Sequence, residues 1–211
     1  MSGRLADEKR QDVIIKAVAN SKHNEDIQII FCGQGPNKEI YEKLAKRVKL
    51  ANPLRIKFCT YEELRETLNY IDLYIHASDF EIEGIAAMEA ITCGAVPLIS
   101  DSPACATQEF ALDKERCLFK HGSYKDLAKK IDWFYEHPEE LKRMQGEYLK
   151  TADRYHLDDS VVALEKMFID AYNEQKEGKD LHSVKPRRKD KRLLKRLYRN
   201  AKRKQKKHCV K

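Results

Sequence analysis

The sequence predicts an α/β protein built on a doubly wound parallel sheet. Short apolar runs alternate along the chain with longer segments in which apolar residues recur every three or four positions, the pattern of buried strands joined by helices. Glycine or proline follows several of the predicted strands and marks the turns into the helices. At 211 residues, the chain is long enough for one well-packed domain and an appendage.

Residues 78–94 are the centre of this prediction. The apolar run at 73–77 ends at Ser78, and Gly84 then opens a short helix that ends at Gly94. In open α/β sheets a ligand binds outside the carboxyl ends of the strands, where a helix N-terminus offers unpaired N–H groups to an anion. The segment therefore predicts an anion-binding site in front of Gly84.

Two acidic residues flank this helix start. Glu81 lies on the loop, and Glu89, with seven residues between them, lies about one and a half turns into the helix. Taken alone, such a pair is commonly a helix cap and a solvated helix face. The apolar strand before the pair and the Gly-Ala-Val-Pro strand entry after it favour a ligand-binding role instead.

This segment resembles the E-x7-E signature of the retaining glycosyltransferases of family four, which have the GT-B fold. The resemblance implies that Glu89 binds the ribose of a nucleotide sugar, and that Glu81 and the backbone of Gly84, Ile85 and Ala86 contact the donor sugar and its diphosphate. The usual E-G-F-G-L is replaced here by E-I-E-G-I, which keeps only the second glycine. The fold implied is the Rossmann-like C-terminal half of GT-B.

The start of the chain resembles a second motif of that family, G-R-L-x-x-E-K. The resemblance implies that Arg4 and Lys9 bind the donor diphosphate, for which an Arg fork and a Lys point charge are well suited. Taken singly, an Arg and a Lys near the start of a chain are more often solvated surface; their position before a helix, with the acid pair downstream, favours the binding role. In the family an apolar strand precedes this motif, whereas here Met1 stands near its expected end. We therefore expect the chain to be the C-terminal part of a longer protein, with its acceptor domain encoded upstream, or the product of a split or truncated gene.

The remaining elements are predicted from periodicity and turn signals. Helices are expected at 13–20, 40–50, 60–68, 124–135, 138–154 and 160–174, and strands at 27–32, 54–59, 96–100 and 118–119. Thr60 has Glu63 at capping-box spacing. The helix at 160–174 is expected to bury one stripe, formed by Val161, Leu164, Met167, Phe168 and Tyr172.

Two further features concern the donor and the acceptor. The resemblance makes Cys59 and Thr60 candidate contacts of the nucleotide base, although Cys59 is equally consistent with a core residue. The run at 101–113 and the E-I-E of the acid loop are similar to bacterial diacylglycerol glucosyltransferases. That similarity implies UDP-glucose as the donor and a membrane lipid as the acceptor.

Metal and disulfide chemistry are not predicted. The six cysteines form no C-x-x-C pair, no histidine lies at metal-ligand spacing, and no D-x-D motif occurs. We therefore expect no metal or other cofactor, and cysteines that are small core residues of a reducing compartment. No signal peptide or long apolar run is visible in the sequence. The expected location is cytoplasmic, with the option of peripheral attachment to the inner face of the membrane.

The positive charge belongs to the end of the chain. Residues 179–211 hold 16 Lys and Arg against two acidic residues, a net +14, so the total of +7 leaves −7 on the rest. We divide the chain into a donor-binding domain, 1–177, and a polybasic tail, 178–211. Residues 185–211 can form a basic amphipathic helix for an anionic membrane, at roughly 1 kcal/mol per cation near the surface. A solvated tail and a nucleic-acid contact are the alternatives.

Two functions follow from these observations. The first is a donor-binding half of a retaining hexosyltransferase, transferring glucose from UDP-glucose to a lipid or other acceptor and needing its acceptor domain for full activity. The second is a non-catalytic module delivered to a membrane or to RNA by its tail. Tyr198 is the only aromatic residue of the tail, which disfavours base stacking.

Overall fold

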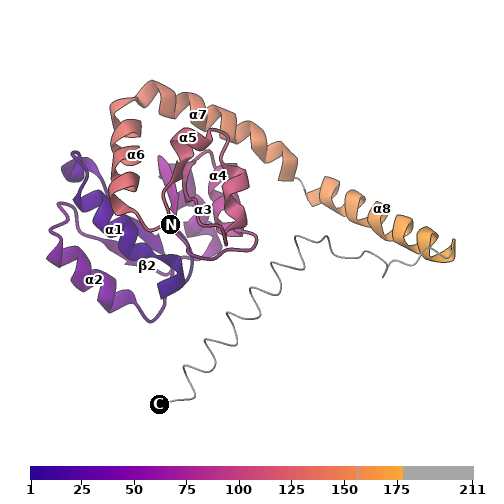
Figure 1. Ribbon diagram of the computed structural model, residues 1–211, viewed down its shortest axis with the longest axis horizontal. Coiled ribbons are helices and arrows are strands. Elements are labelled where there is room, and N and C mark those ends of the chain that lie inside the picture. The colour runs from indigo at the N-terminus through magenta and orange to yellow at the C-terminus, as the bar shows by residue number, and fades with distance from the viewer. Residues whose placement is uncertain (156, 178–211) are drawn as a thin grey trace, which may run out of the picture. The chain divides into compact units, whose positions relative to one another are not determined.

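The computed structural model describes residues 1–155 and 157–177. The chain divides into two compact units, Met1–His156 and a second that begins at Leu157. The first unit holds parallel sheets flanked by helices, as the sequence predicts (Figure 1). The predicted basic tail at 178–211 lies outside the described residues.

Five strands form two parallel sheets in the first unit. One sheet pairs β1 with β2, and the other has the order β3-β4-β5. The bounds are β1 Ile30–Cys32, β2 Arg55–Lys57, β3 Leu73–His76, β4 Val96–Ser100 and β5 Leu118–Phe119. All five residues of β4 are buried, as expected of a central strand covered on both faces.

Eight α-helices and four short 3-10 helices complete the described residues. The α-helices are α1 Gln11–Ala19, α2 Lys38–Arg47, α3 Tyr61–Tyr70, α4 Ile85–Thr92, α5 Lys114–Cys117, α6 Tyr124–Glu136, α7 Pro138–Thr151 and α8 Leu157–Lys176. The 3-10 helices are η1 Asp7–Lys9, η2 Asn24–Asp26, η3 Ala106–Phe110 and η4 Ala152–Tyr155. Within the first unit α1 packs against α2 and α6, and α4 packs against α7.

Several predicted bounds were wrong. The strand predicted at 27–32 begins only at Ile30. The strand predicted at 54–59 ends at Lys57, which places Cys59 in the following loop. Neither η3 nor α5 was predicted, because each is too short to show a helical period.

The predicted buried stripe on the last helix was also wrong. All five of its side chains are exposed in α8, from 48% at Leu164 to 63% at Phe168. A lone helix has no second element of its own unit, among the described residues, against which to bury an apolar face. No helix in the described part of the chain is both long enough and apolar enough to span a bilayer.

The first residues of the chain lie between the two sheets. The N–H of Cys32 donates to the carbonyl of Met1 at 3.0 Å, and the N–H of Gly3 donates to the carbonyl of Cys32 at 2.9 Å, which extends β1 on that side. The hydroxyl of Tyr74 on β3 lies 3.1 Å from the hydroxyl of Ser2. Residues 1–3 therefore connect β1 with the second sheet.

Two glycines allow the next residues to approach the turn after β1. A Cβ at Gly33 would lie 2.0 Å from the carbonyl oxygen of Gly3, and one at Gly35 would lie 2.4 Å from that of Leu5. Both distances are far below a van der Waals contact, so side chains there would push the two loops apart. The close approach fixes Arg4 beside the Gly33–Gly35 turn.

Candidate functional site

Three adjoining cavities lie at the carboxyl ends of the strands, and Arg4 lines all of them. We name them the Lys38 cavity, about 600 Å³, the Glu89 cavity, about 520 Å³, and the Glu81 cavity, about 710 Å³. These volumes lie within the usual range of ligand sites. Of the three, the Glu81 cavity is the one lined by Gly84, in front of which the sequence predicts an anion site.

The Glu81 cavity holds six of the nine predicted site residues. Arg4, Lys9 and Glu81 line it together with the loop and helix start formed by Gly84, Ile85 and Ala86. The ammonium of Lys9 lies 2.7 Å from Oε2 of Glu81, and both side chains are about four-fifths buried. Lys9 and Glu81, which are 72 positions apart in the sequence, thus form a largely buried ion pair.

Electrostatics keep the Glu81 carboxylate charged. Burial alone would raise its pKa, but the hydrogen bond and charge of Lys9 hold the pKa below its ordinary value. Arg4 is paired with the carboxylate of Glu8, four residues along the chain. Lys9 and Arg4, the two residues predicted to bind the diphosphate, are therefore both paired with carboxylates in the structure.

The acid loop is held on both sides of Glu81. The N–H of Glu81 donates to the carbonyl of Ala104 at 3.2 Å, and the N–H of Ala106 donates to the carbonyl of Glu81 at 3.0 Å. Closer to β3, Asp79 accepts from Arg10 Nη1 at 2.9 Å. The carboxylate is thus carried on a loop whose backbone is fixed.

The start of α4 has the geometry of an anion site. Gly84 is its N-cap residue with φ +73°, a conformation that favours glycine, and a Cβ there would lie 2.1 Å from Cγ2 of Thr107. The N–H groups of Ile85 and Ala86, as at every helix start, have no acceptor within the helix. They are available to a ligand oxygen.

The Glu89 cavity brings together the other predicted residues except Thr60. Glu89, the fifth residue of α4, lines it with Arg4, Ala86 and Cys59. No residue in the described ranges donates a hydrogen bond to the Glu89 carboxylate. Burial and the neighbouring Cys32 raise the pKa of the Cys59 thiol to about 11, so Cys59 is neutral and not a nucleophile at neutral pH.

Thr60 lines none of the three cavities. Its hydroxyl accepts from the N–H of Glu63 at 3.3 Å, and its own N–H donates to the Glu63 side chain at 2.8 Å. The capping box predicted from the sequence is therefore confirmed. Both polar groups of Thr60 are used in this cap rather than facing a ligand.

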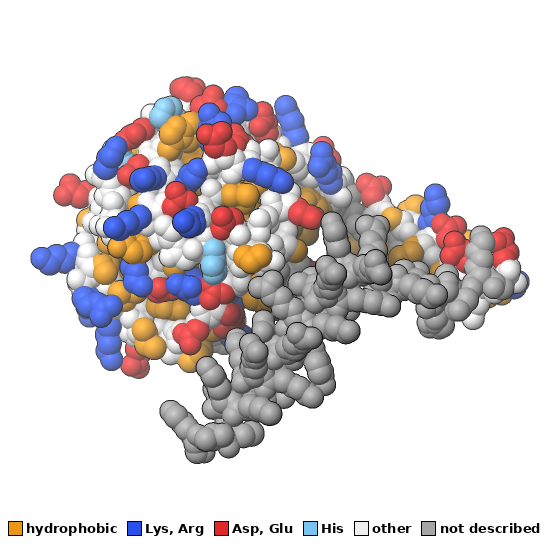
Figure 2. Space-filling view, viewed as in Figure 1, with side chains coloured by type: hydrophobic (Ala, Val, Ile, Leu, Met, Phe, Trp, Pro, Cys, Tyr) orange, Lys and Arg blue, Asp and Glu red, His pale blue; other side chains and the backbone are white. Residues whose placement is uncertain are grey.

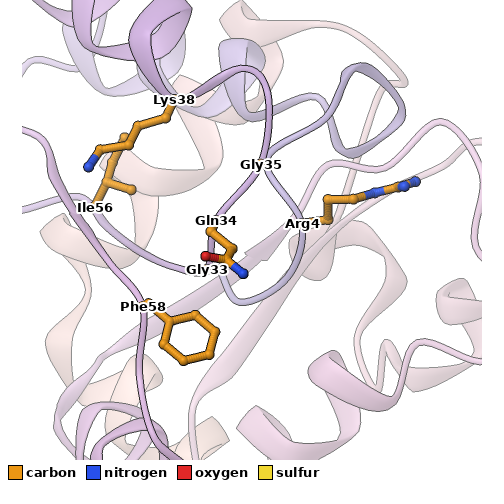
Figure 3. Close-up of a pocket in the computed structure, with 7 residues that line it drawn as sticks. All are labelled: Arg4, Gly33, Gln34, Gly35, Lys38, Ile56 and Phe58. Carbon is orange, nitrogen blue, oxygen red and sulfur yellow. The ribbon is translucent and has the colours of Figure 1, made fainter.

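The sequence analysis missed several cavity residues, and two of them are Phe58 and His76. Phe58 is 70% exposed and lines both the Lys38 and the Glu89 cavity, where Figure 3 shows its ring below Gly33 and Gln34. His76 is the last residue of β3 and lines the Glu81 cavity. For His76 the sequence did contain a signal: it is a titratable residue inside the apolar run at 73–77, close to the polar loop that begins at Ser78.

The two cations that line the Lys38 cavity do not point toward each other (Figure 3). In Figure 3 the side chains of Arg4 and Lys38 extend away from each other, on opposite sides of the glycine turn. Over the visible face of the first unit, basic and acidic side chains are interspersed without a large area of one sign (Figure 2). No group of three or more His, Cys, Asp or Glu suited to a metal ion occurs in the described part of the chain.

Comparison with known proteins gives consistent matches. The family model described as "Glycosyl transferases group 1" matches residues 1–151. The chain is 25% identical over 146 residues to the glycosyltransferase YqgM of Bacillus subtilis (strain 168), and 34% identical over 129 residues to a 2-deoxystreptamine N-acetyl-D-glucosaminyltransferase of Niallia circulans. These alignments cover 68% and 60% of this chain. The chain spans only 40% and 33% of the length of these two curated relatives.

Solved structures have the same fold. The catalytic domain of cholesterol-alpha-glucosyltransferase from Helicobacter pylori is 45% identical, with a TM-score of 0.70 over 74% of this chain and 96% of that domain. Anabaena HepE, solved with UDP and glucose, is 20% identical with a TM-score of 0.66, over 82% of this chain and 47% of HepE; this similarity concerns the fold alone.

Proposed function

The chain belongs to the glycosyl transferases group 1 family, and from that membership we propose that it is the donor-binding part of a retaining hexosyltransferase of family four. The proposed donor is UDP-glucose. The observation that carries the proposal is the Lys9–Glu81 ion pair at the start of α4, with Glu89 in the adjoining cavity.

The cavities suggest how the donor is arranged. We assign the nucleoside to the Glu89 cavity, where the Glu89 carboxylate can accept two hydrogen bonds from the ribose hydroxyls. The exposed ring of Phe58 offers a flat surface to the base. The diphosphate and the sugar then occupy the Glu81 cavity, next to Lys9 and the first N–H groups of α4.

The charges fit the proposed reaction. Transfer breaks the bond between sugar C1 and the diphosphate and joins C1 to an acceptor oxygen, so negative charge develops on the departing UDP. Lys9, Arg4 and the helix start lie where fixed positive groups stabilise such charge. A diphosphate must compete with Glu81 for Lys9 and with Glu8 for Arg4. In this proposal the protein's cations, rather than a metal ion, stabilise the leaving group.

The sugar and the acceptor are the finer part of the proposal. Glucose is supported by the 45% identity with a cholesterol-alpha-glucosyltransferase. That relative's named acceptor is a lipid alcohol, which supports a membrane lipid hydroxyl as the acceptor here. The α-linkage in its name supports a retaining outcome.

Isothermal titration of UDP-glucose into the full chain tests the donor site. We expect the wild type to bind and Glu89→Ala to bind about tenfold or more weakly, because two hydrogen bonds to a charged group are lost. Glu66→Ala, at an exposed position of α3 that lines no cavity, is the matched control and should bind as wild type. Absence of binding by a folded wild type would refute the donor site.

Membrane attachment by residues 178–211 is a second, separate proposal that rests on their net charge. We expect the full chain to bind vesicles containing anionic lipid at low salt and to be released as the salt concentration rises. Vesicles of neutral lipid are the control. Equal binding to both vesicle types, or preferential binding of RNA over anionic vesicles, would contradict membrane attachment and favour the alternative of a nucleic-acid-binding module.

A further inference from the structure

His76 is a buried polar residue whose hydrogen bonds are unmade. It closes β3, its side chain is 2% exposed, and neither ring nitrogen has a hydrogen-bond partner in the described residues. Buried polar side chains nearly always have such a partner, so an exception calls for an explanation. The ring faces the Glu81 cavity.

The charged group nearest to the His76 ring is the Glu81 carboxylate, which is already paired with Lys9. Nε2 of His76 lies 3.6 Å from Oε2 of Glu81, beyond hydrogen-bond distance, while the Lys9 ammonium lies 2.7 Å from the same oxygen. Burial lowers the pKa of His76 to about 4; the charge of Glu81 opposes this shift and that of Lys9 adds to it. At neutral pH the imidazole therefore has one N–H donor and one acceptor nitrogen.

A bound diphosphate changes the hydrogen bonds that Lys9 and Glu81 make. When Lys9 turns to a phosphate oxygen, the Glu81 carboxylate loses its side-chain donor and keeps the N–H of Ile82. A partly buried carboxylate that loses a donor is destabilised unless another replaces it. The Nε2–H of His76 needs to move only a few tenths of an ångström to become that donor.

We propose that His76 is a positioning residue that takes over Glu81 from Lys9 when the donor binds, and so holds the carboxylate in place for the sugar. This inference rests on the proposed function of the same site. His76 acts through Glu81, so its effect must appear with every ligand that draws Lys9 away from that carboxylate, with UDP as well as with UDP-glucose. It must also disappear when the carboxylate is absent.

The test measures the binding of UDP-glucose and of UDP by isothermal titration for five forms of the full chain, the wild type and four variants. His76→Leu, which fills the space without a polar atom, should weaken the binding of both ligands about tenfold. His76→Gln, whose amide N–H reaches the position of Nε2, should restore most of the UDP-glucose affinity. In a Glu81→Ala background, adding His76→Leu should have no further effect. Thermal melting confirms that each form is folded.

The outcomes separate the two claims. If wild type binds neither UDP nor UDP-glucose, the proposed function fails. If wild type binds both and His76→Leu weakens the binding of neither, the positioning role is refuted. The role is also refuted if His76→Leu costs as much in the Glu81→Ala background as alone, since His76 would then act independently of the carboxylate.

Discussion

Acid should destabilise the protein through His76 by an amount that can be worked out. The pKa of the folded protein's His76 is about 4, against an ordinary value of 6.5. Above pH 6.5 the ring is neutral in both the folded and the unfolded state. As the pH falls from 6.5 toward 4, the unfolded chain takes up a proton that the folded protein does not. At pH 4.5 the wild type should therefore lose roughly 2–3 kcal/mol of unfolding free energy from this residue.

His76→Gln removes the titrating group and should remove this loss. The assay is urea unfolding at pH 7.5 and 4.5, followed by the fluorescence of Trp133, the only tryptophan in the sequence. The difference between wild type and His76→Gln should shift by roughly 2–3 kcal/mol in favour of the variant at the lower pH. His121→Gln, at a side chain that is 39% exposed, serves as the control without such an acid-dependent gain. A difference that is the same at both pH values would show that the buried ring is not kept neutral.

Three other substitutions probe the frame of the site. Gly84→Ala should lower the unfolding free energy by about 1–3 kcal/mol in urea, because φ is +73° and the new Cβ would meet Thr107. The control is Gly146→Ala, in open space within α7, which should raise the unfolding free energy by about 0.5–1 kcal/mol. If Gly84→Ala and Gly146→Ala changed the unfolding free energy equally, the steric argument would be contradicted. Tyr74→Phe should cost about 1–3 kcal/mol in thermal melts because the buried Ser2 hydroxyl loses its partner, and an unchanged melting temperature would contradict this. Lys9→Met should weaken UDP binding about tenfold in titrations and raise the pKa of the Glu81 carboxyl, whereas unchanged UDP affinity would remove Lys9 from the diphosphate site.

Local rules were enough to predict much of the fold. The strand at 96–100 was predicted at its observed bounds because a continuous apolar run next to a glycine turn has few other interpretations. The Thr60–Glu63 capping box depends on four consecutive residues and was likewise visible. Such features are set by neighbours in the chain.

Long-range contacts were less accessible to sequence reasoning. The spacing of Glu81 and Glu89 indicated a helix start, and the family resemblance assigned Lys9 and Glu81 to one site, but neither predicted that the two side chains form an ion pair. His76 looked like one more residue of an apolar strand, because its burial and its empty hydrogen-bond positions depend on loops far along the chain. The exposure of α8 could not be predicted because periodicity gives an apolar face without its partner.

The cations of the Glu81 cavity and their local counter-ion all lie within one stretch of six residues, from Arg4 through Glu8 to Lys9. The acid loop, in contrast, depends on contacts with two distant segments, Glu8 and Arg10 near the start of the chain and residues 104–107. The strength of diphosphate binding can therefore be altered by exchanging a single short peptide between relatives. The acidic side has no comparable single segment, because its supports come from two segments far apart in the sequence.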